Sequence, residues 1–118
     1  MKKSIRLKVW KKFGRRCAYC GNLLQYQDMQ VDHLIPRLKG RSDKNIVEVF
    51  ENYMPSCRRC NHYKRSYGLE DFRELMQTLH SRVLDQYLCK VAFDYGIIEV
   101  FPFDGQFYFE KYGKENDD

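Results

Sequence analysis

Four of the five cysteines in this chain of 118 residues form two C-x-x-C pairs. The first pair is Cys17 and Cys20, the second is Cys57 and Cys60, and 36 residues separate them. Each C-x-x-C turn directs two thiolates at one point, and two such turns complete the tetrahedral ligand set of a structural zinc ion. Disulfide bonds are the competing interpretation, but thiols stay reduced in the cytosol, and an odd number of cysteines fits a disulfide framework poorly. The pattern therefore predicts a structural zinc site.

A chain of this length is typical of one domain, and small domains bury a lower fraction of their surface than large ones. Charged residues make up 31% of the chain and the mean hydropathy is -0.69, which excludes a membrane-embedded protein. Lysines and arginines interrupt the apolar residues near the N-terminus, so no secretory signal is expected. We predict a single soluble domain over residues 1–118, located in the cytoplasm.

The charge of the chain is divided between its two halves. Residues 1–66 contain 16 Lys and Arg against 5 Asp and Glu, whereas residues 67–118 contain 5 against 11. Solvated surface charge is the ordinary explanation of such an imbalance. A basic half also attracts polyanions, because neutralising their phosphates releases counterions. The imbalance favours a nucleic-acid partner that is bound by the first half.

Hydrophobic spacing predicts an α+β fold. Apolar residues at helical spacing among lysines and arginines indicate a basic helix that ends at Gly14. Residues 29–35 alternate as a strand that Pro36 terminates, which places Asp32 and His33 at the strand end. An extended stretch over residues 46–54 and a short helix over 58–66 follow. The predicted order is strand, strand, helix.

The second half of the chain has a different pattern. From Leu69 to Leu88, apolar residues recur every three or four positions, which predicts an amphipathic helix with a break near Ser81. Residues 97–101 and 107–112 flank an Asp-Gly pair and are typical of a β-hairpin. The tail at 114–118 is expected to be disordered. Residues 67–113 are thus predicted to form a helix and hairpin extension.

Three further motifs lie between and after the cysteine pairs. They are D-H-x-x-P beginning at Asp32, an asparagine at position 52, five residues before Cys57, and C-x-x-C-N-x-x-K ending at Lys64. In combination with the cysteines they resemble the HNH endonuclease family over about residues 13–66. The resemblance implies a ββα-metal fold, in which two strands and a helix surround a catalytic metal and a four-cysteine zinc knuckle lies at the base.

The same resemblance implies a role for each motif residue. His33 would be the general base, Asp32 and Asn61 would bind a divalent cation, and Asn52 would orient the loop that follows His33. A histidine with an ordinary pKa of about 6.5 is suited to deprotonating water near neutral pH. Carboxylate and amide oxygens favour Mg²⁺ or Mn²⁺. The implied activity is metal-dependent hydrolysis of phosphodiester bonds in DNA, with duplex DNA as the expected substrate.

Basic residues near these motifs are candidates for contacts with the DNA backbone. Lys64 lies one helical turn after Asn61 and would bind a phosphate as a point charge. The other candidates are Arg37, Arg58, Arg59 and Arg65.

Two interpretations other than catalysis stay open. The chain could be a non-catalytic zinc-knuckle module that binds nucleic acid, or an adaptor in a larger phage or bacterial DNA-processing complex. A homodimer is a further expected assembly. Strict strand alternation also sends Asp32 and His33 to opposite faces, although both would serve one site.

Overall fold

The computed structural model describes residues 1–38 and 43–114, which group into two compact units. The first unit combines Met1–Leu69 with Phe107–Asp118, and the second is Glu70–Gln106. Residues 115–118 of the tail predicted at 114–118, and residues 39–42, which follow the predicted strand, lie outside the described residues.

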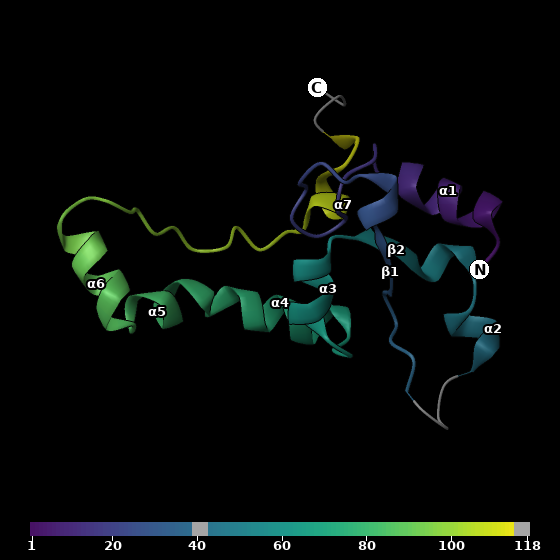
Figure 1. Ribbon diagram of the computed structural model, residues 1–118. Coiled ribbons are helices and arrows are strands. Elements are labelled where there is room, and N and C mark those ends of the chain that lie inside the picture. The colour runs from purple at the N-terminus through teal and green to yellow at the C-terminus, as the bar shows by residue number, and fades with distance from the viewer. Residues whose placement is uncertain (39–42, 115–118) are drawn as a thin grey trace. The chain divides into compact units, whose positions relative to one another are not determined.

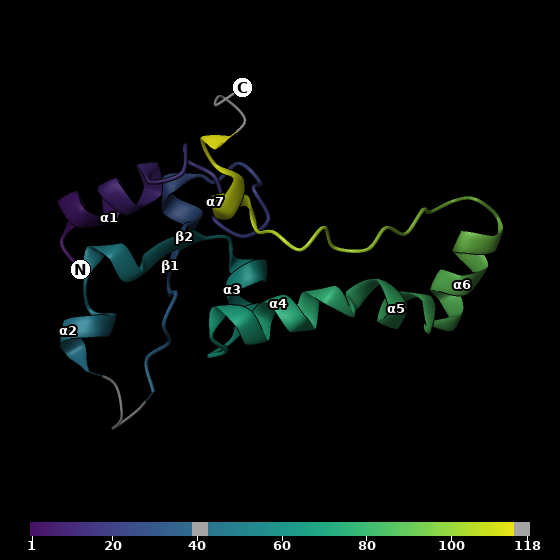
Figure 2. The same cartoon turned by 180° about the vertical axis from the view of Figure 1, so that it is seen from behind.

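The centre of the first unit is a two-stranded antiparallel sheet followed by a helix (Figures 1 and 2). Strand β1 is Gln30–His33 and strand β2 is Tyr53–Ser56, with Asp32 opposite Met54 and His33 opposite Tyr53. Helix α3, Arg58–Lys64, begins directly after β2 and contacts β1. The predicted α+β fold with a ββα core is confirmed.

The predicted basic helix is α1, Lys3–Lys11, and it packs against the sheet region. Its buried Val9 forms a core with Leu24 and Met29, which flank the short 3-10 helix η1, Tyr26–Asp28. Lys12, just after α1, donates to three backbone carbonyls of residues 50–53 at 2.8 to 3.3 Å. These bonds tie α1 to the start of β2.

The extended stretch predicted for residues 46–54 is wrong for most of its length. The chain forms helix α2, Lys44–Val47, and then the 3-10 helix η2, Phe50–Asn52, before β2 begins. Asp43 causes the first departure, because its side chain caps α2 by accepting from Asn45 N at 2.8 Å. Local capping therefore prevails over the β-branched residues of this segment.

The predicted β-hairpin near the C-terminus is also wrong. Residues 97–106 contain neither strand nor helix, and Tyr108–Lys111 is helix α7. Phe107 N donates to the side chain of Glu110 at 2.8 Å, which starts the helix. Tyr108 N and Phe109 N donate to backbone carbonyls of residues 18 and 19. The backbone groups that a hairpin would pair instead bind the first cysteine turn.

The second unit contains three short helices where one interrupted helix was predicted. They are α4, Leu69–Gln77, α5, Leu79–Leu84, and α6, Tyr87–Asp94. The breaks fall at Thr78 and at residues 85–86 rather than near Ser81. Thr78 favours the first break because its hydroxyl donates to Leu75 O at 3.1 Å, which satisfies a carbonyl at the end of α4. No helix among the described residues is long and apolar enough to cross a bilayer.

Candidate metal and catalytic sites

The four paired cysteines meet in the first unit although they are distant in sequence. Their Sγ atoms all lie within 4.8 Å of one another. A tetrahedral zinc ion with bonds of 2.3 Å separates its sulfur ligands by about 3.8 Å, and the Cys20 and Cys57 sulfurs are 3.9 Å apart. None of the five cysteines forms a disulfide. The cluster therefore fits a structural zinc ion, as predicted.

Backbone amides and neighbouring thiols determine the charge of this cluster. Asn22 N and Cys60 N donate to the sulfurs of Cys20 and Cys57 at 3.5 and 3.4 Å. Hydrogen bonds from neighbouring thiols lower the pKa of Cys17, and the hydrogen bond to Cys17 raises the pKa of Cys20 to about 11. The thiolate is therefore favoured at Cys17 and disfavoured at Cys20. A zinc ion held by the four sulfurs would supply positive charge that favours their deprotonated form.

Asp32 lies in a buried polar cluster between β1 and α3. Its Oδ2 is 3.0 Å from the ammonium of Lys64 and also accepts a hydrogen bond from the hydroxyl of Tyr19. Asp32 is 6% exposed and Lys64 is fully buried. Burial and the Asp32 carboxylate raise the pKa of Tyr19, so its hydroxyl stays protonated and donates. Within residues 1–38 and 43–114, no hydrogen-bond partner occupies the other carboxylate oxygen, Oδ1.

Asn61 is held at the same interface in a similar way. Its Nδ2 donates to the side chain of Gln30 at 2.5 Å. Gln30 and Asp32 are two residues apart and share one face of β1, just as Asn61 and Lys64 share one face of α3. In the described part of the chain, nothing hydrogen-bonds to the amide oxygen of Asn61. Asp32 and Asn61 thus each keep one hard oxygen free, and this donor set fits Mg²⁺ or Mn²⁺.

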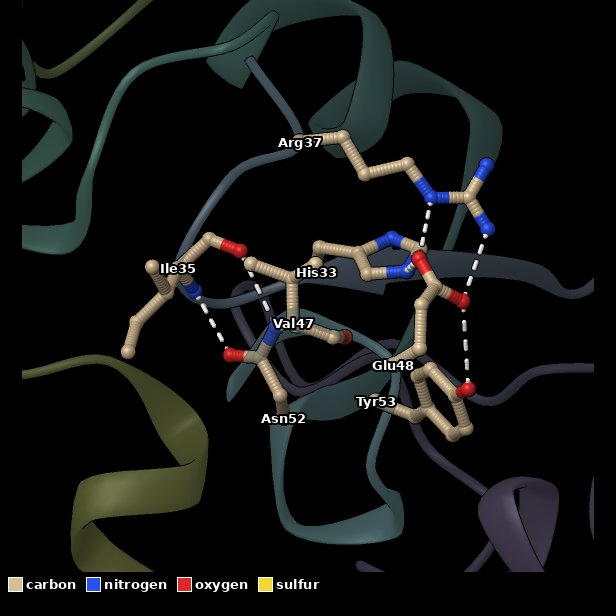
Figure 3. Close-up of polar contacts among 7 residues, drawn as sticks. All are labelled: His33, Ile35, Arg37, Val47, Glu48, Asn52 and Tyr53. Carbon is tan, nitrogen blue, oxygen red and sulfur yellow. Dashed lines mark hydrogen bonds and ion pairs between the residues drawn. The ribbon is translucent and has the colours of Figure 1, made fainter. Parts of the chain in front are cut away.

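His33 faces the opposite side of β1 from Asp32, as strand alternation requires. Its Nε2 lies 3.1 Å from Oε1 of Glu48, and its ring packs edge-on against Tyr53 (Figure 3). The side chain of His33 is 13% exposed. Lys64 connects the two faces, because its ammonium also donates to the carbonyl of His33 at 3.1 Å. The backbone of β1, rather than direct contact, links Asp32 to His33.

Asn52 closes the base of the loop that follows His33 (Figure 3). Its Oδ1 accepts from Ile35 N at 2.7 Å, while its Nδ2 donates to the carbonyls of Ile35 and Val47 at 2.9 and 3.0 Å. Asn52 is buried, and its bond to the Val47 carbonyl is buried with it. The side chain joins the two ends of the segment between residues 35 and 47.

The arginines predicted to contact DNA are all exposed, whereas Lys64 is not. Arg58 and Arg59 line a cavity of about 830 Å³ beside the cysteine cluster. Arg65 ends α3 with a positive φ of 55°. Arg37 forms a bidentate pair with Glu48, through Nε at 2.5 Å and Nη2 at 3.0 Å. The phosphate contact predicted for Lys64 would require its ammonium to leave Asp32.

Sequence reasoning missed three residues that hold the candidate catalytic groups, namely Tyr19, Gln30 and Glu48. Tyr19 lies inside the first C-x-x-C turn, and Gln30 precedes Asp32 by one strand repeat. Gln30 gave a weak signal, because a side chain two residues from Asp32 on a strand shares its face, whereas no signal in the sequence indicated the contact of Tyr19 with Asp32. Glu48 gave none, since it is 15 residues from His33 in a stretch without a motif.

A four-thiol cluster beneath two strands and a helix defines a zinc-knuckle domain of the ββα-metal class. Residues 17–66 match the family model described as HNH endonuclease, and this match confirms the predicted resemblance. A stretch of 49 residues is 37% identical to the CRISPR-associated endonuclease Cas9 of Corynebacterium diphtheriae. That match covers 42% of this chain but spans only 4% of the length of the relative. No solved structure gives a significant match.

Replacing Lys64 by Met is expected to destabilise the zinc-loaded protein by about 3 to 5 kcal/mol, because the Asp32 charge would stay buried without its partner. Denaturant unfolding measures the loss. Lys3→Met is the matched control, since Lys3 is exposed on α1, and its effect should stay within about 0.5 kcal/mol. Equal stability of the two variants would show that the ion pair does not support the fold.

Proposed function

We propose that this chain is a metal-dependent HNH endonuclease that hydrolyses phosphodiester bonds in DNA. The observation that carries the proposal is the arrangement along β1 and α3. Asp32 and Asn61 are each anchored through one side-chain atom and keep one oxygen free. Adjacent His33 is anchored through Nε2, so its Nδ1 is left for chemistry.

The proposed reaction uses water as the nucleophile. Nδ1 of His33 accepts a proton from a water molecule as the water oxygen attacks the phosphorus. The bond from phosphorus to O3′ breaks, and O3′ leaves with the bonding electrons and takes a proton from solvent. A divalent cation held by Asp32 and Asn61 would supply Lewis-acid stabilisation of the leaving oxygen. The protonated imidazole then returns its proton to solvent.

The other parts of the first unit have supporting roles in this proposal. Asn52 holds the loop after His33 in place through its three hydrogen bonds. The DNA backbone is bound by the exposed Arg58, Arg59 and Arg65. Arg37 contacts the same backbone close to His33, the proposed general base. Lys64 positions Asp32 and the His33 carbonyl from its buried site. A reducing compartment such as the cytoplasm suits a site built from four thiolates.

Cleavage of supercoiled plasmid tests the proposed function. Purified zinc-loaded protein is expected to nick or linearise the plasmid when Mg²⁺ or Mn²⁺ is added. It should be inactive when EDTA is added after zinc loading, provided that zinc content stays constant. Separate measurement of zinc in the EDTA sample distinguishes loss of the catalytic cation from loss of the fold. Absence of cleavage, with DNA retained in a salt-sensitive complex, would instead support the non-catalytic binding module.

A further inference from the structure

The Glu48 carboxylate is the centre of a polar network that includes His33 (Figure 3). Its Oε1 faces His33 Nε2 at 3.1 Å and accepts from Arg37 Nε at 2.5 Å. Its Oε2 accepts from Arg37 Nη2 at 3.0 Å and from the hydroxyl of Tyr53 at 3.3 Å. Both oxygens therefore have fixed partners, and the carboxylate is held in one orientation. A bidentate arginine contact of this kind has high geometric specificity.

The charge of Glu48 determines which nitrogen of His33 carries a proton. The hydrogen bond from Arg37 holds the pKa of Glu48 below its ordinary value, so the carboxylate is ionised and can only accept. The His33 Nε2 facing it must therefore donate. In the neutral ring the proton then lies on Nε2 and the lone pair on Nδ1. In Figure 3 the second ring nitrogen of His33 points away from the carboxylate.

The ring of His33 is also restrained from a second direction. The Tyr53 ring packs against it edge-on, with centroids 5.4 Å apart and an interplanar angle of 85°. Tyr53 lies directly opposite His33 in the antiparallel sheet and also donates to Glu48. The same pair of residues, Glu48 and Tyr53, thus restrains both rotation of the imidazole and the position of its proton.

We propose that Glu48 is a positioning residue for His33: it holds the proton on Nε2 and aims the Nδ1 lone pair at the attacking water. Arg37 orients Glu48 in turn, so it contributes to catalysis through this pair as well as through any contact with DNA. The inference rests on the proposed function, since it assigns a task to the general base of that reaction. The geometry that supports it exists in the absence of substrate.

Two variants of Glu48 separate positioning from a structural role. Glu48→Ala removes the acceptor and is expected to lower kcat by about 10- to 100-fold, with KM unchanged, because a misaligned base loses efficiency. Glu48→Gln keeps an acceptor oxygen and should retain most of kcat. Glu51→Ala is the matched control, because Glu51 is an exposed carboxylate in the same segment, and it should behave as wild type.

The imidazole proton provides a readout that does not depend on cleavage. In NMR spectra of the zinc-loaded protein, the Nε2 proton of His33 should exchange slowly in the wild type, in Glu48→Gln and in Glu51→Ala. It should be lost to exchange in Glu48→Ala. If the wild-type protein fails to cleave DNA but shows this pattern, the proposed function fails while the contact stands.

Three results would overturn the proposal. The first is a wild-type protein without a protected His33 proton. The second is a folded Glu48→Ala protein with wild-type kcat. The third is a Glu48→Gln protein that keeps the protected proton but loses as much kcat as Glu48→Ala, because charge rather than orientation would then be the contribution of Glu48.

Discussion

Cys60→Ser protein is expected to lose its bound zinc and, with it, the fold of the first unit. The four sulfurs converge from the segment before β1 and the segment after β2, so one metal ion would join these two segments at the end of the sheet where Gln30 pairs with Ser56. Structural zinc supplies an apparent binding free energy of about 10 to 16 kcal/mol. This binding free energy is comparable to the stability of about 5 to 15 kcal/mol that is usual for a whole domain.

Zinc content and circular dichroism, measured on the same sample, test this expectation. Cys89→Ser is the matched control, because Cys89 lies on α6 in the second unit and is not among the clustered cysteines. It should keep one equivalent of zinc and a cooperative unfolding transition. A Cys60→Ser protein that is folded without zinc would exclude a structural metal at this cluster.

His33→Ala is expected to lower kcat for plasmid cleavage by about 10²- to 10⁴-fold, the usual contribution of a general base. The His33 ring is partly exposed and does not belong to the Val9 core, so the variant should fold and retain zinc. DNA binding should also be unchanged, because the exposed arginines are not altered.

Single-turnover cleavage with saturating protein isolates the chemical step. His80→Ala is the control, since His80 lies on α5, outside the HNH segment. It should cleave at the wild-type rate. If His33→Ala cleaves as fast as His80→Ala, His33 is not the base, and the assignment of Nδ1 must be abandoned.

The zinc cluster and the ββα order could be predicted because short-range spacing encodes them. A C-x-x-C turn fixes two sulfurs by itself, and the alternation of residues 29–35 reports one strand. The predicted hairpin failed because its aromatic residues have strong β propensity, yet contacts made by Phe107 and Tyr108 to the first cysteine turn decide their structure. Propensity yields to such tertiary contacts.

The candidate site was predictable by residue type but not by environment. The motif contains Asp32, His33, Asn61 and Lys64, whereas it says nothing of what each side chain contacts. Whether Lys64 binds phosphate or Asp32 depends on its burial, which arises from the packing of α3 on β1. The partner of His33 depends on how the chain folds between residues 36 and 48, and no local pattern describes that path.

The first unit is discontinuous in sequence, and this has a consequence for the order in which it forms during synthesis. All four cysteines have been synthesised once the chain reaches residue 60, so zinc can bind as soon as they emerge from the ribosome. Phe107, which packs on Tyr19, and Tyr112, which packs on Phe13, are made only after the second unit. At a synthesis rate of about 5 to 20 residues per second, Phe107 and Tyr112 are added several seconds after the last of the four cysteines. During this interval the aromatic contacts to Tyr19 and Phe13 cannot form. A nascent chain stalled in that interval would expose the aromatic face of the first cysteine turn to chaperones.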